Sequence, residues 1–285
     1  MHTMRSRTRR VLERVGLRRR PVQVEMARPY VVHLDGRAEL EGLVAVVTGG
    51  SGAIGRAIAF RLAMSGADVY VVARSTERVE QVVQEILEHG GAAHASQVDL
   101  ENDVAVAEFF ASLPRVDILV NCAGGSARGE HAAVWAQSLE VVDRILSVNL
   151  RAAISCVRAV APKMIAQGSG RIISVGSIIG NAGKARFADY GAAKAGLAGY
   201  MKSAAIELGP HGVTVNLVSP GIVPRGRQTQ SELERLKRTN VLGTVGREED
   251  IAEAVGFLAG PRAGFITGQD LAVDGGRSLG LRGDE

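Results

Sequence analysis

The sequence contains few cysteines and few aromatic residues. Its 285 residues include two cysteines, Cys122 and Cys156, and Phe, Trp and Tyr together make up 4%. The cysteines have no metal-ligand spacing and each lies in an apolar run, so we expect no metal site and a reducing, cytoplasmic setting. No uninterrupted apolar run reaches the roughly 18 residues that indicate a membrane-spanning helix, so we expect no membrane span.

Basic charge is concentrated in the first twenty residues. The net charge is +4, but residues 1–20 contain eight arginines and one acid, Glu13, so the remaining residues carry about −3 (4 − 7). We predict that residues 1–41 are a disordered, Arg-rich extension, or that the start codon was assigned too early. The alternatives are organellar targeting, or contact with nucleic acid or an anionic membrane. For the folded domain, residues 42–285, we expect no nucleic-acid partner.

From residue 43 onward, strand-like runs alternate with helix-like stretches. The predicted strands are 43–47, 68–72, 93–98, 116–120, 171–177, 213–218 and 269–273, and the predicted helices include 54–64, 77–89, 138–166, 190–208 and 250–259. Runs that are apolar throughout are typical of parallel strands buried on both faces. The alternation predicts a single α/β domain with a doubly wound parallel sheet of about seven strands flanked by helices. The polar residues 222–246 are predicted to form a mobile lid on the substrate side.

A glycine-rich turn follows the first predicted strand. Residues 48–55 have the sequence TGGSGAIG and join this strand to a helix. Such a turn allows backbone N–H groups to approach a phosphate at the N-terminus of the helix. Ala53 stands where a glycine is more usual, and we expect its single methyl group to be tolerated.

The second predicted strand ends without an acidic residue. An acid at this place would bind the ribose 2′-hydroxyl of NAD, whereas Ala73 leaves room and Arg74, followed by Ser75, can pair with a 2′-phosphate. This favours NADP(H), with NAD(H) possible. The alternative for Arg74 is a solvated surface charge.

Polar and small residues follow the next two strands. Asp99, which precedes Leu100, either accepts a hydrogen bond from an adenine amino group or caps the helix that begins near Asn102. Residues 121–125, NCAGG, are small enough to allow close approach of a cofactor, although they would also suit an ordinary turn. Asn149 lies inside the predicted helix 138–166, where Asn is unfavourable, and predicts a local kink with a bound water.

The stretch from Ser177 to Lys194 contains a serine, a tyrosine thirteen residues later and a lysine four residues after that. If Tyr190 opens a helix, Lys194 lies one turn on and on the same face. A cation about 4 Å from a phenol is worth roughly 4 kcal/mol at an effective dielectric of 20. This interaction would bring the phenol, whose pKa is ordinarily about 10, within range of acid–base catalysis near neutral pH. Ser177 would bind the substrate oxygen. An isolated Tyr-x-x-x-Lys pair is more often a surface feature, but here a nucleotide-binding turn precedes it.

Together these motifs resemble the short-chain dehydrogenase/reductase family. TGGSGAIG, VDL, NCAG, SVNL, SVGS, YGAAK, SPG and VDGG occur in the family's order within residues 42–279, and the ending GQDLAVDGG is similar to the 3-oxoacyl-carrier-protein reductase branch. The resemblance implies a Rossmann-type fold and hydride transfer between a nicotinamide cofactor and a carbonyl or secondary alcohol. It also implies a small-molecule, acyl-carrier or thioester carbonyl substrate and a homotetramer or homodimer.

The resemblance also implies roles for individual residues. Tyr190 is the proton donor or acceptor, Lys194 lowers its pKa and binds the nicotinamide ribose, and Ser177 orients the substrate oxygen. Asn149 holds a water linked to Lys194. The implied cofactor-binding residues are Gly49, Ser51, Gly52, Ile54, Arg74, Ser75, Asp99, Leu100, Asn121, Tyr190, Lys194 and Val223.

One position near the lid departs from the family pattern. Arg225 stands where the family often has a threonine, and we expect it to meet an anionic substrate or the cofactor phosphates. The leading prediction is an NADP(H)-dependent carbonyl reductase, which could also oxidise the corresponding secondary alcohol. An NAD-linked secondary-alcohol dehydrogenase is the alternative. A non-catalytic NADP-sensing or scaffold protein on the same fold would be expected to lack part of the catalytic set, which is complete here.

Overall fold

A seven-stranded sheet lies at the centre of the part of the chain that the computed structural model describes, residues 39–126 and 129–279. Its strands are β1 (Val44–Thr48), β2 (Asp68–Ala73), β3 (Ala92–Gln97), β4 (Ile118–Asn121), β5 (Gly170–Val175), β6 (Val213–Pro220) and β7 (Asp270–Val273). They pair in parallel in the order β3-β2-β1-β4-β5-β6-β7. The chain order reverses at β1, which pairs with both β2 and β4, so the predicted doubly wound parallel sheet is confirmed.

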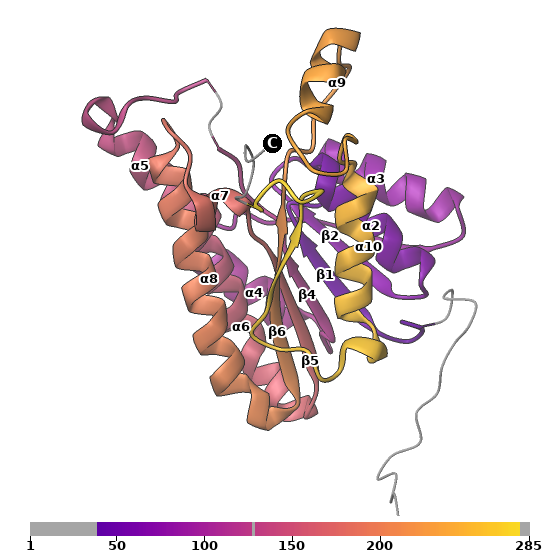
Figure 1. Cartoon of the computed structure of the whole chain (residues 1–285). Coiled ribbons are helices and arrows are strands. Elements are labelled where there is room, and N and C mark those ends of the chain that lie inside the picture. The colour runs from indigo at the N-terminus through magenta and orange to yellow at the C-terminus, as the bar shows by residue number, and fades with distance from the viewer. Residues whose placement is uncertain (1–38, 127–128, 280–285) are drawn as a thin grey trace, which may run out of the picture. The chain divides into compact units, whose positions relative to one another are not determined.

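Helices cover both faces of this sheet (Figure 1). One layer contains α2 (Ala53–Met64), α3 (Thr76–Glu88) and α10 (Glu248–Ala259), and the other contains α4 (Asp103–Ser112), α6 (Ala152–Gln167) and α8 (Ala188–Leu208). Three shorter helices complete the described α-helices: α5 (Leu139–Leu146), α7 (Ile178–Ala182) and α9 (Gln230–Lys237). Of these, α7 and α9 follow the C-terminal ends of β5 and β6.

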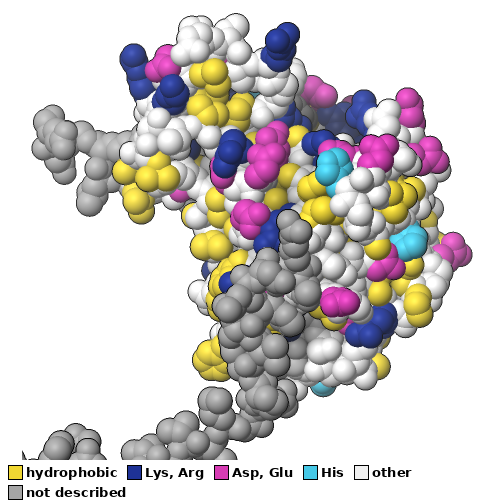
Figure 2. Space-filling model, turned by 90° about the vertical axis from the view of Figure 1, so that its right-hand side faces the viewer, with side chains coloured by type: hydrophobic (Ala, Val, Ile, Leu, Met, Phe, Trp, Pro, Cys, Tyr) yellow, Lys and Arg dark blue, Asp and Glu magenta, His cyan; other side chains and the backbone are white. Residues whose placement is uncertain are grey.

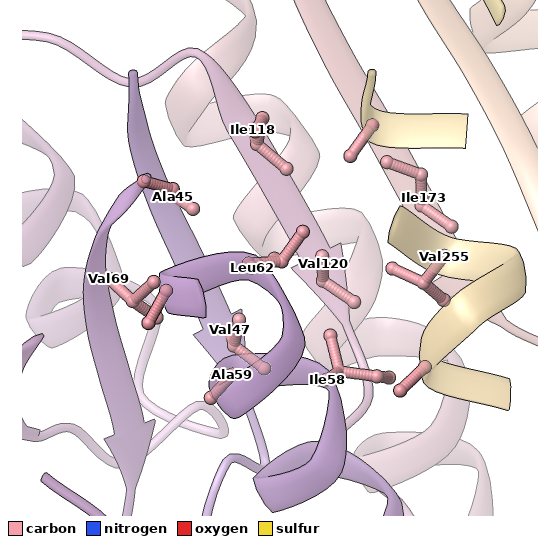
Figure 3. Close-up of a cluster of buried hydrophobic side chains, with 14 of the residues drawn as sticks. Ala45, Val47, Ile58, Ala59, Leu62, Val69, Ile118, Val120, Ile173 and Val255 are labelled. Atoms are coloured by element: carbon pink, nitrogen blue, oxygen red, sulfur yellow. The ribbon is translucent and has the colours of Figure 1, made fainter. Parts of the chain in front are cut away.

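Each face of the sheet packs against its own layer of apolar side chains. Successive residues of a strand point to opposite faces, and along β1 Val47 belongs to the core cluster under α2 and α10, whereas Val46 belongs to the cluster under α6 and α8. Figure 3 shows Ile58 and Leu62 of α2 and Val255 of α10 over the strands, and all three are fully buried. Both faces of the central strands are therefore apolar, which is why they were recognisable as continuous apolar runs.

The outer surface of the layer that contains α2, α3 and α10 carries charges of both signs. Acidic and basic side chains are interspersed on the visible part of this face (Figure 2). Arg56 of α2 pairs with Glu85 of α3, and Arg61 of α2 pairs with Glu253 of α10 at 2.8 Å. Exposed pairs of this kind contribute at most about 1 kcal/mol each, so the apolar layer beneath them determines the packing.

The first described residues already belong to the folded core. Leu40 is 1% exposed, and its backbone N–H donates to the carbonyl of Ser65 at 2.9 Å. The core thus begins two residues before the predicted domain boundary at residue 42. Residues 1–38, most of the predicted extension, lie outside the described residues.

One described helical region, Leu139–Gln167, is long and apolar enough by composition to cross a membrane. Its second half is α6, in which Cys156, Val160 and Met164 are buried in the core cluster between the helix and the sheet. This second half therefore packs as a core helix of the folded domain.

Candidate active site

A cleft of about 880 Å³ lies where the strands of the sheet end. Residues that follow β1, β2, β3, β4, β5 and β6 line it, together with parts of α8 and α9. It includes the point at which the strand order reverses between β1 and β4, which is where open α/β sheets bind their ligands. All the predicted site residues except Asn121 line this cleft.

The glycine-rich turn between β1 and α2 is tightly packed. Gly49 has a φ of +66°, and a Cβ atom at Gly55 would lie 2.2 Å from the carbonyl oxygen of Gly49. No side chain caps the N-terminus of α2 and no acidic residue lies in its first turn. The N–H groups of Gly50 and Gly52 donate to backbone carbonyls, whereas those in the first turn of α2 remain available to an anion in the cleft. The methyl group of Ala53 is exposed, so it does not disturb the packing.

Thr48, the last residue of β1, ties the glycine-rich turn to the loop after β4. Its hydroxyl donates to the carbonyl of Val120 at 3.3 Å and accepts from the N–H groups of Cys122 at 3.2 Å and Ala123 at 3.4 Å. Thr48 is 1% exposed. Sequence reasoning gave it no role, although a threonine that ends a buried strand just before a glycine-rich turn is a recognisable signal.

Two arginines line the cleft near the end of β2. Arg74 is 72% exposed and lies 3.7 Å from the carboxylate of Glu101. Arg78, four residues later in the first turns of α3, also lines the cleft and was not predicted. Ser75 precedes α3 and makes no capping hydrogen bond. This end of the cleft is therefore suited to a phosphate group, besides the anion that the glycine-rich turn can bind.

Asp99 is not a helix cap. The cap of α4 is Asn102, whose Oδ1 accepts from the N–H groups of Val104 at 3.0 Å and Ala105 at 3.2 Å. Asp99 instead accepts from the N–H group of Glu101 at 3.1 Å and lines the cleft. The capping alternative is thus wrong, and the position remains compatible with the predicted adenine contact.

Asn121, which was predicted to contact the cofactor, does not line the cleft, and that contact stays a prediction. It is 5% exposed, and its Nδ2 donates to Oγ of Ser174, its partner residue on the neighbouring strand β5, at 3.2 Å. Asn121 is still part of β4, where neighbouring residues point to opposite faces. In this segment of the chain, the residues that line the cleft begin with Cys122.

Ser177, Tyr190 and Lys194 meet on one wall of the cleft. Ser177 follows β5 and caps α7, with its hydroxyl oxygen accepting from the N–H group of Ile179 at 3.2 Å. The helix α8 begins at Ala188, so Tyr190 lies in its first turn and Lys194 one turn further on. The Nζ atom of Lys194 lies 5.8 Å from the centre of the Tyr190 ring.

Lys194 is held in a buried position at the base of the cleft. It is 6% exposed, and its Nζ donates to the carbonyl of Val175 at 2.8 Å. Burial lowers the pKa of this ammonium to about 8, so it is mostly charged at neutral pH. Burial raises the pKa of the Cys122 thiol beside it to about 11, so this thiol is neutral and not a nucleophile.

Asn149 clamps the loop that follows β4. Its Oδ1 accepts from the N–H group of Gly125 at 3.1 Å, and its Nδ2 donates to the carbonyls of Gly125 at 2.9 Å and Ile145 at 3.0 Å. A Cβ atom on Gly124 would lie 2.4 Å from Asn149 Oδ1 and 3.7 Å from Lys194 Nζ. Asn149 and Lys194 therefore both lie against this glycine.

The helical region predicted over 138–166 is confirmed as Leu139–Gln167, with an irregularity inside it. A π-helical turn, Ser147–Arg151, separates α5 from α6 and contains Asn149. π turns are often found at functional sites. The position of the irregularity agrees with the predicted kink, and the water predicted beside Asn149 stays a prediction.

An aromatic pair, His131 and Phe187, lines the cleft near Lys184. The rings of His131 and Phe187 lie 4.1 Å apart, and Arg186, with a φ of +67°, donates to the carbonyl of His131 at 3.0 Å. The Nζ atom of Lys184 lies 4.0 Å from the centre of the Phe187 ring. Sequence reasoning missed these residues, which precede α8 or belong to the loop after β4, because no local pattern brings the two segments together.

Part of the predicted lid is helical. Thr229 begins α9 with a capping box, in which its hydroxyl accepts from the N–H group of Glu232 and the Glu232 carboxylate accepts from the N–H group of Thr229. Arg225, Arg235 and Leu236 of this segment line the cleft. Among the described residues, no group of three His, Cys, Asp or Glu side chains is placed to hold a metal ion.

Comparisons with known proteins agree with this architecture. A model of the family described as short chain dehydrogenase matches residues 43–236. The chain is 37% identical over 243 residues to a 3-oxoacyl-[acyl-carrier-protein] reductase of Synechocystis sp., which covers 83% of this chain and 97% of that protein. It is 37% identical over 250 residues to the short-chain reductase protein NovJ of Streptomyces niveus, and the match covers 82% of this chain and 93% of NovJ. A solved structure described as a short chain dehydrogenase/reductase family protein matches with a TM-score of 0.76 at 38% identity, covering 85% of this chain and 100% of that one.

Proposed function

Because the chain belongs to the short-chain dehydrogenase/reductase family and is thus an NAD(P)-dependent oxidoreductase, we propose that it reduces a ketone or aldehyde carbonyl with NADPH. The observation that carries this proposal is the convergence of Ser177, Tyr190 and Lys194 on a cleft that also contains the glycine-rich turn. The reverse reaction, oxidation of a secondary alcohol, uses the same groups.

The residues of the cleft fit a nicotinamide dinucleotide that carries a 2′-phosphate. The unobstructed turn at Gly49 and Gly55 and the free N–H groups at the start of α2 suit the pyrophosphate. Arg74 suits the 2′-phosphate, with Arg78 beside it. Val223 lines the cleft and would meet the carboxamide through its backbone. When bound, the cofactor supplies the hydride.

Tyr190 is the proposed proton donor to the carbonyl oxygen. The charged Lys194 lies next to its ring, and a neighbouring cation favours the phenolate that remains after the proton has been transferred. Lys194 retains this charge at neutral pH because its pKa, although lowered by burial, stays near 8. Losing the charge at higher pH would remove the stabilisation of the phenolate.

Ser177 is the proposed second donor to the carbonyl oxygen. Its oxygen already accepts from the N–H group of Ile179, so its own hydroxyl proton is left to point into the cleft. Asn149 acts indirectly in this scheme. By clamping Gly125 and lying against Gly124, it fixes the loop opposite Lys194.

The curated relatives suggest candidate substrates but do not select one. The names of several of them specify 3-oxoacyl-[acyl-carrier-protein] reductases, so a 3-oxoacyl thioester is a natural first compound. An NAD-linked alcohol dehydrogenase would require the end of β2 to accept a cofactor without a 2′-phosphate. The exposed Arg74 does not favour this alternative.

The proposal is tested with the purified full chain by following the absorbance of the reduced nicotinamide. NADPH and NADH are each paired with a 3-oxoacyl thioester and a panel of ketones and aldehydes. We expect turnover with NADPH, and a loss of at least about 100-fold in kcat for Tyr190→Phe, because general acid catalysis contributes roughly that much. Tyr200→Phe, on the same helix but outside the cleft, is the matched control. Equal activity of Tyr190→Phe and the wild type would contradict the assigned role.

A further inference from the structure

The two ends of the cleft differ in charge. The carboxylates that line it in the described part of the chain, Asp99 and Glu101, both follow β3, at the end where Arg74 lies. The end formed by the loop before α8 and by the lid contributes cations alone: Lys184, Arg225 and Arg235. A cleft end whose charged lining residues are all basic favours an anionic ligand there.

Arg225 is the cation in this group whose charge acts at the centre of the site. It follows β6, two residues after Val223, and lines the cleft. Its charge, together with that of Lys194, acts to lower the pKa of the Cys122 thiol at the end of β4, against the larger effect of burial. The guanidinium therefore lies close enough to influence the wall of the cleft that contains Lys194.

Arg225 also lacks a carboxylate partner. Two other cations of this region each have a carboxylate within 4 Å. Lys237, in the lid, pairs with Glu234 at 2.8 Å, and Arg247, just after the lid, pairs with Asp250 at 3.3 Å. Arg225 forms no such pair with any described residue, and the one hydrogen bond recorded for it is accepted by its backbone carbonyl from Gln228. Its planar group of donors is thus available to bind a carboxylate through two parallel hydrogen bonds.

Resting on the proposed function, we propose that the substrate is an oxo acid, whose free carboxylate lies one or two carbons from the reacting carbonyl and is bound by Arg225. The carbonyl carbon accepts the hydride of the nicotinamide cofactor and the carbonyl oxygen accepts the proton of Tyr190, so the product is the corresponding hydroxy acid. The position of Arg225 on the same site as Lys194 favours a carboxylate near the carbonyl over a phosphate at the far end of a long thioester.

The kinetic experiment compares each oxo acid with its methyl ester. Pyruvate and acetoacetate are paired with methyl pyruvate and methyl acetoacetate, and the ratio of kcat/KM for acid over ester is measured with NADPH. For at least one pair we expect the ratio to fall by about tenfold or more in Arg225→Gln, mainly through KM, because a charge-assisted hydrogen bond is lost. Arg225→Lys, which keeps the positive charge, should retain more of the acid-to-ester ratio than Arg225→Gln. Arg227→Gln, an exposed lid arginine that does not line the cleft, should leave the ratio unchanged.

A binding experiment tests the same contact without turnover. Calorimetry measures the Kd of 3-hydroxybutyrate and lactate, and of their methyl esters, for the complex of the enzyme with NADPH. We expect Arg225→Gln to weaken at least one acid by about tenfold or more and its ester by less. The Kd of NADPH itself, measured by fluorescence titration, should not change.

The outcomes distinguish a failure of the oxo-acid proposal from a failure of the proposed carbonyl reduction. An unchanged acid-to-ester ratio in Arg225→Gln, with the esters still reduced, would overturn the oxo acid and leave carbonyl reduction intact. A weaker Kd for NADPH in that variant would assign Arg225 to the cofactor phosphates instead. If no carbonyl compound is reduced at all, the proposed function fails, and the calorimetric comparison alone decides whether Arg225 binds a carboxylate.

Discussion

Replacing Lys194 with methionine should stabilise the fold while abolishing turnover. Burial lowers the pKa of this ammonium from 10.5 to about 8. A difference of about 2.5 pKa units corresponds to about 3 kcal/mol of destabilisation by the buried charge at neutral pH. Methionine has a similar length and no charge, but it leaves the carbonyl of Val175 without its donor, which costs about 1 kcal/mol. The expected net gain is therefore about 2 kcal/mol at pH 7.

The pH dependence of this gain identifies its cause. Below pH 8, Lys194 is charged in both the folded and the unfolded protein, so the destabilisation is fully present. Between pH 8 and about 10.5, the folded protein loses this proton before the unfolded chain does, and the stability of the wild type rises relative to Lys194→Met. The advantage of the variant should therefore be largest below pH 8 and shrink toward pH 10.

Urea unfolding at pH 7 and at pH 9.5 measures both effects. Lys202→Met, at an exposed position of the same helix, is the control and should change stability by less than about 0.5 kcal/mol at either pH. A Lys194→Met variant that is less stable than the wild type at pH 7 would refute the argument. So would a gain that is independent of pH, because it would have to come from packing.

Two further predictions concern the ends of the cleft. Glu101→Gln should free Arg74 from its carboxylate at 3.7 Å and lower the Kd of NADPH several-fold with little effect on NADH, whereas Arg74→Ser should raise the Kd of NADPH. Fluorescence titration measures all four constants, and equal changes for both cofactors would contradict the assignment. Gly124→Ala would place a Cβ atom 2.4 Å from Asn149 Oδ1, so we expect kcat to fall by about tenfold or more while the Kd of NADPH changes less. A normal kcat would show that the loop tolerates the methyl group.

The sheet could be predicted from the sequence because its strands are buried on both faces. Val46 and Val47 face different helical layers, yet both are apolar, so the strand appears as one continuous run. The proposed catalytic pair could also be predicted, because it depends only on spacing within one helix. Tyr190 and Lys194 are separated by one helical turn, and the helix predicted over 190–208 agrees with α8 to within two residues.

The sequence was least informative where the placement of a side chain depends on tertiary structure. Asn121 ends a strand, and whether it faces the cleft or the sheet depends on where β4 stops, which the sequence does not specify within one residue. The contact between His131 and Phe187 joins segments about 55 residues apart, so no local pattern could reveal it. The same holds for Asn149, whose amide is satisfied by the loop after β4 and not by its own helix alone.

The positions that break ordinary sequence rules are concentrated at the cleft. Lys194 is a buried cation, and Asn149 sits in a π turn inside a helical region. Each feature costs stability by itself, and the apolar layers on both faces of the sheet outweigh that cost. Gly124, in the loop after β4, lies against both of these residues. A substitution that repairs one of them should therefore make the protein more stable and the site less active, and Lys194→Met is the variant in which both changes can be measured at once.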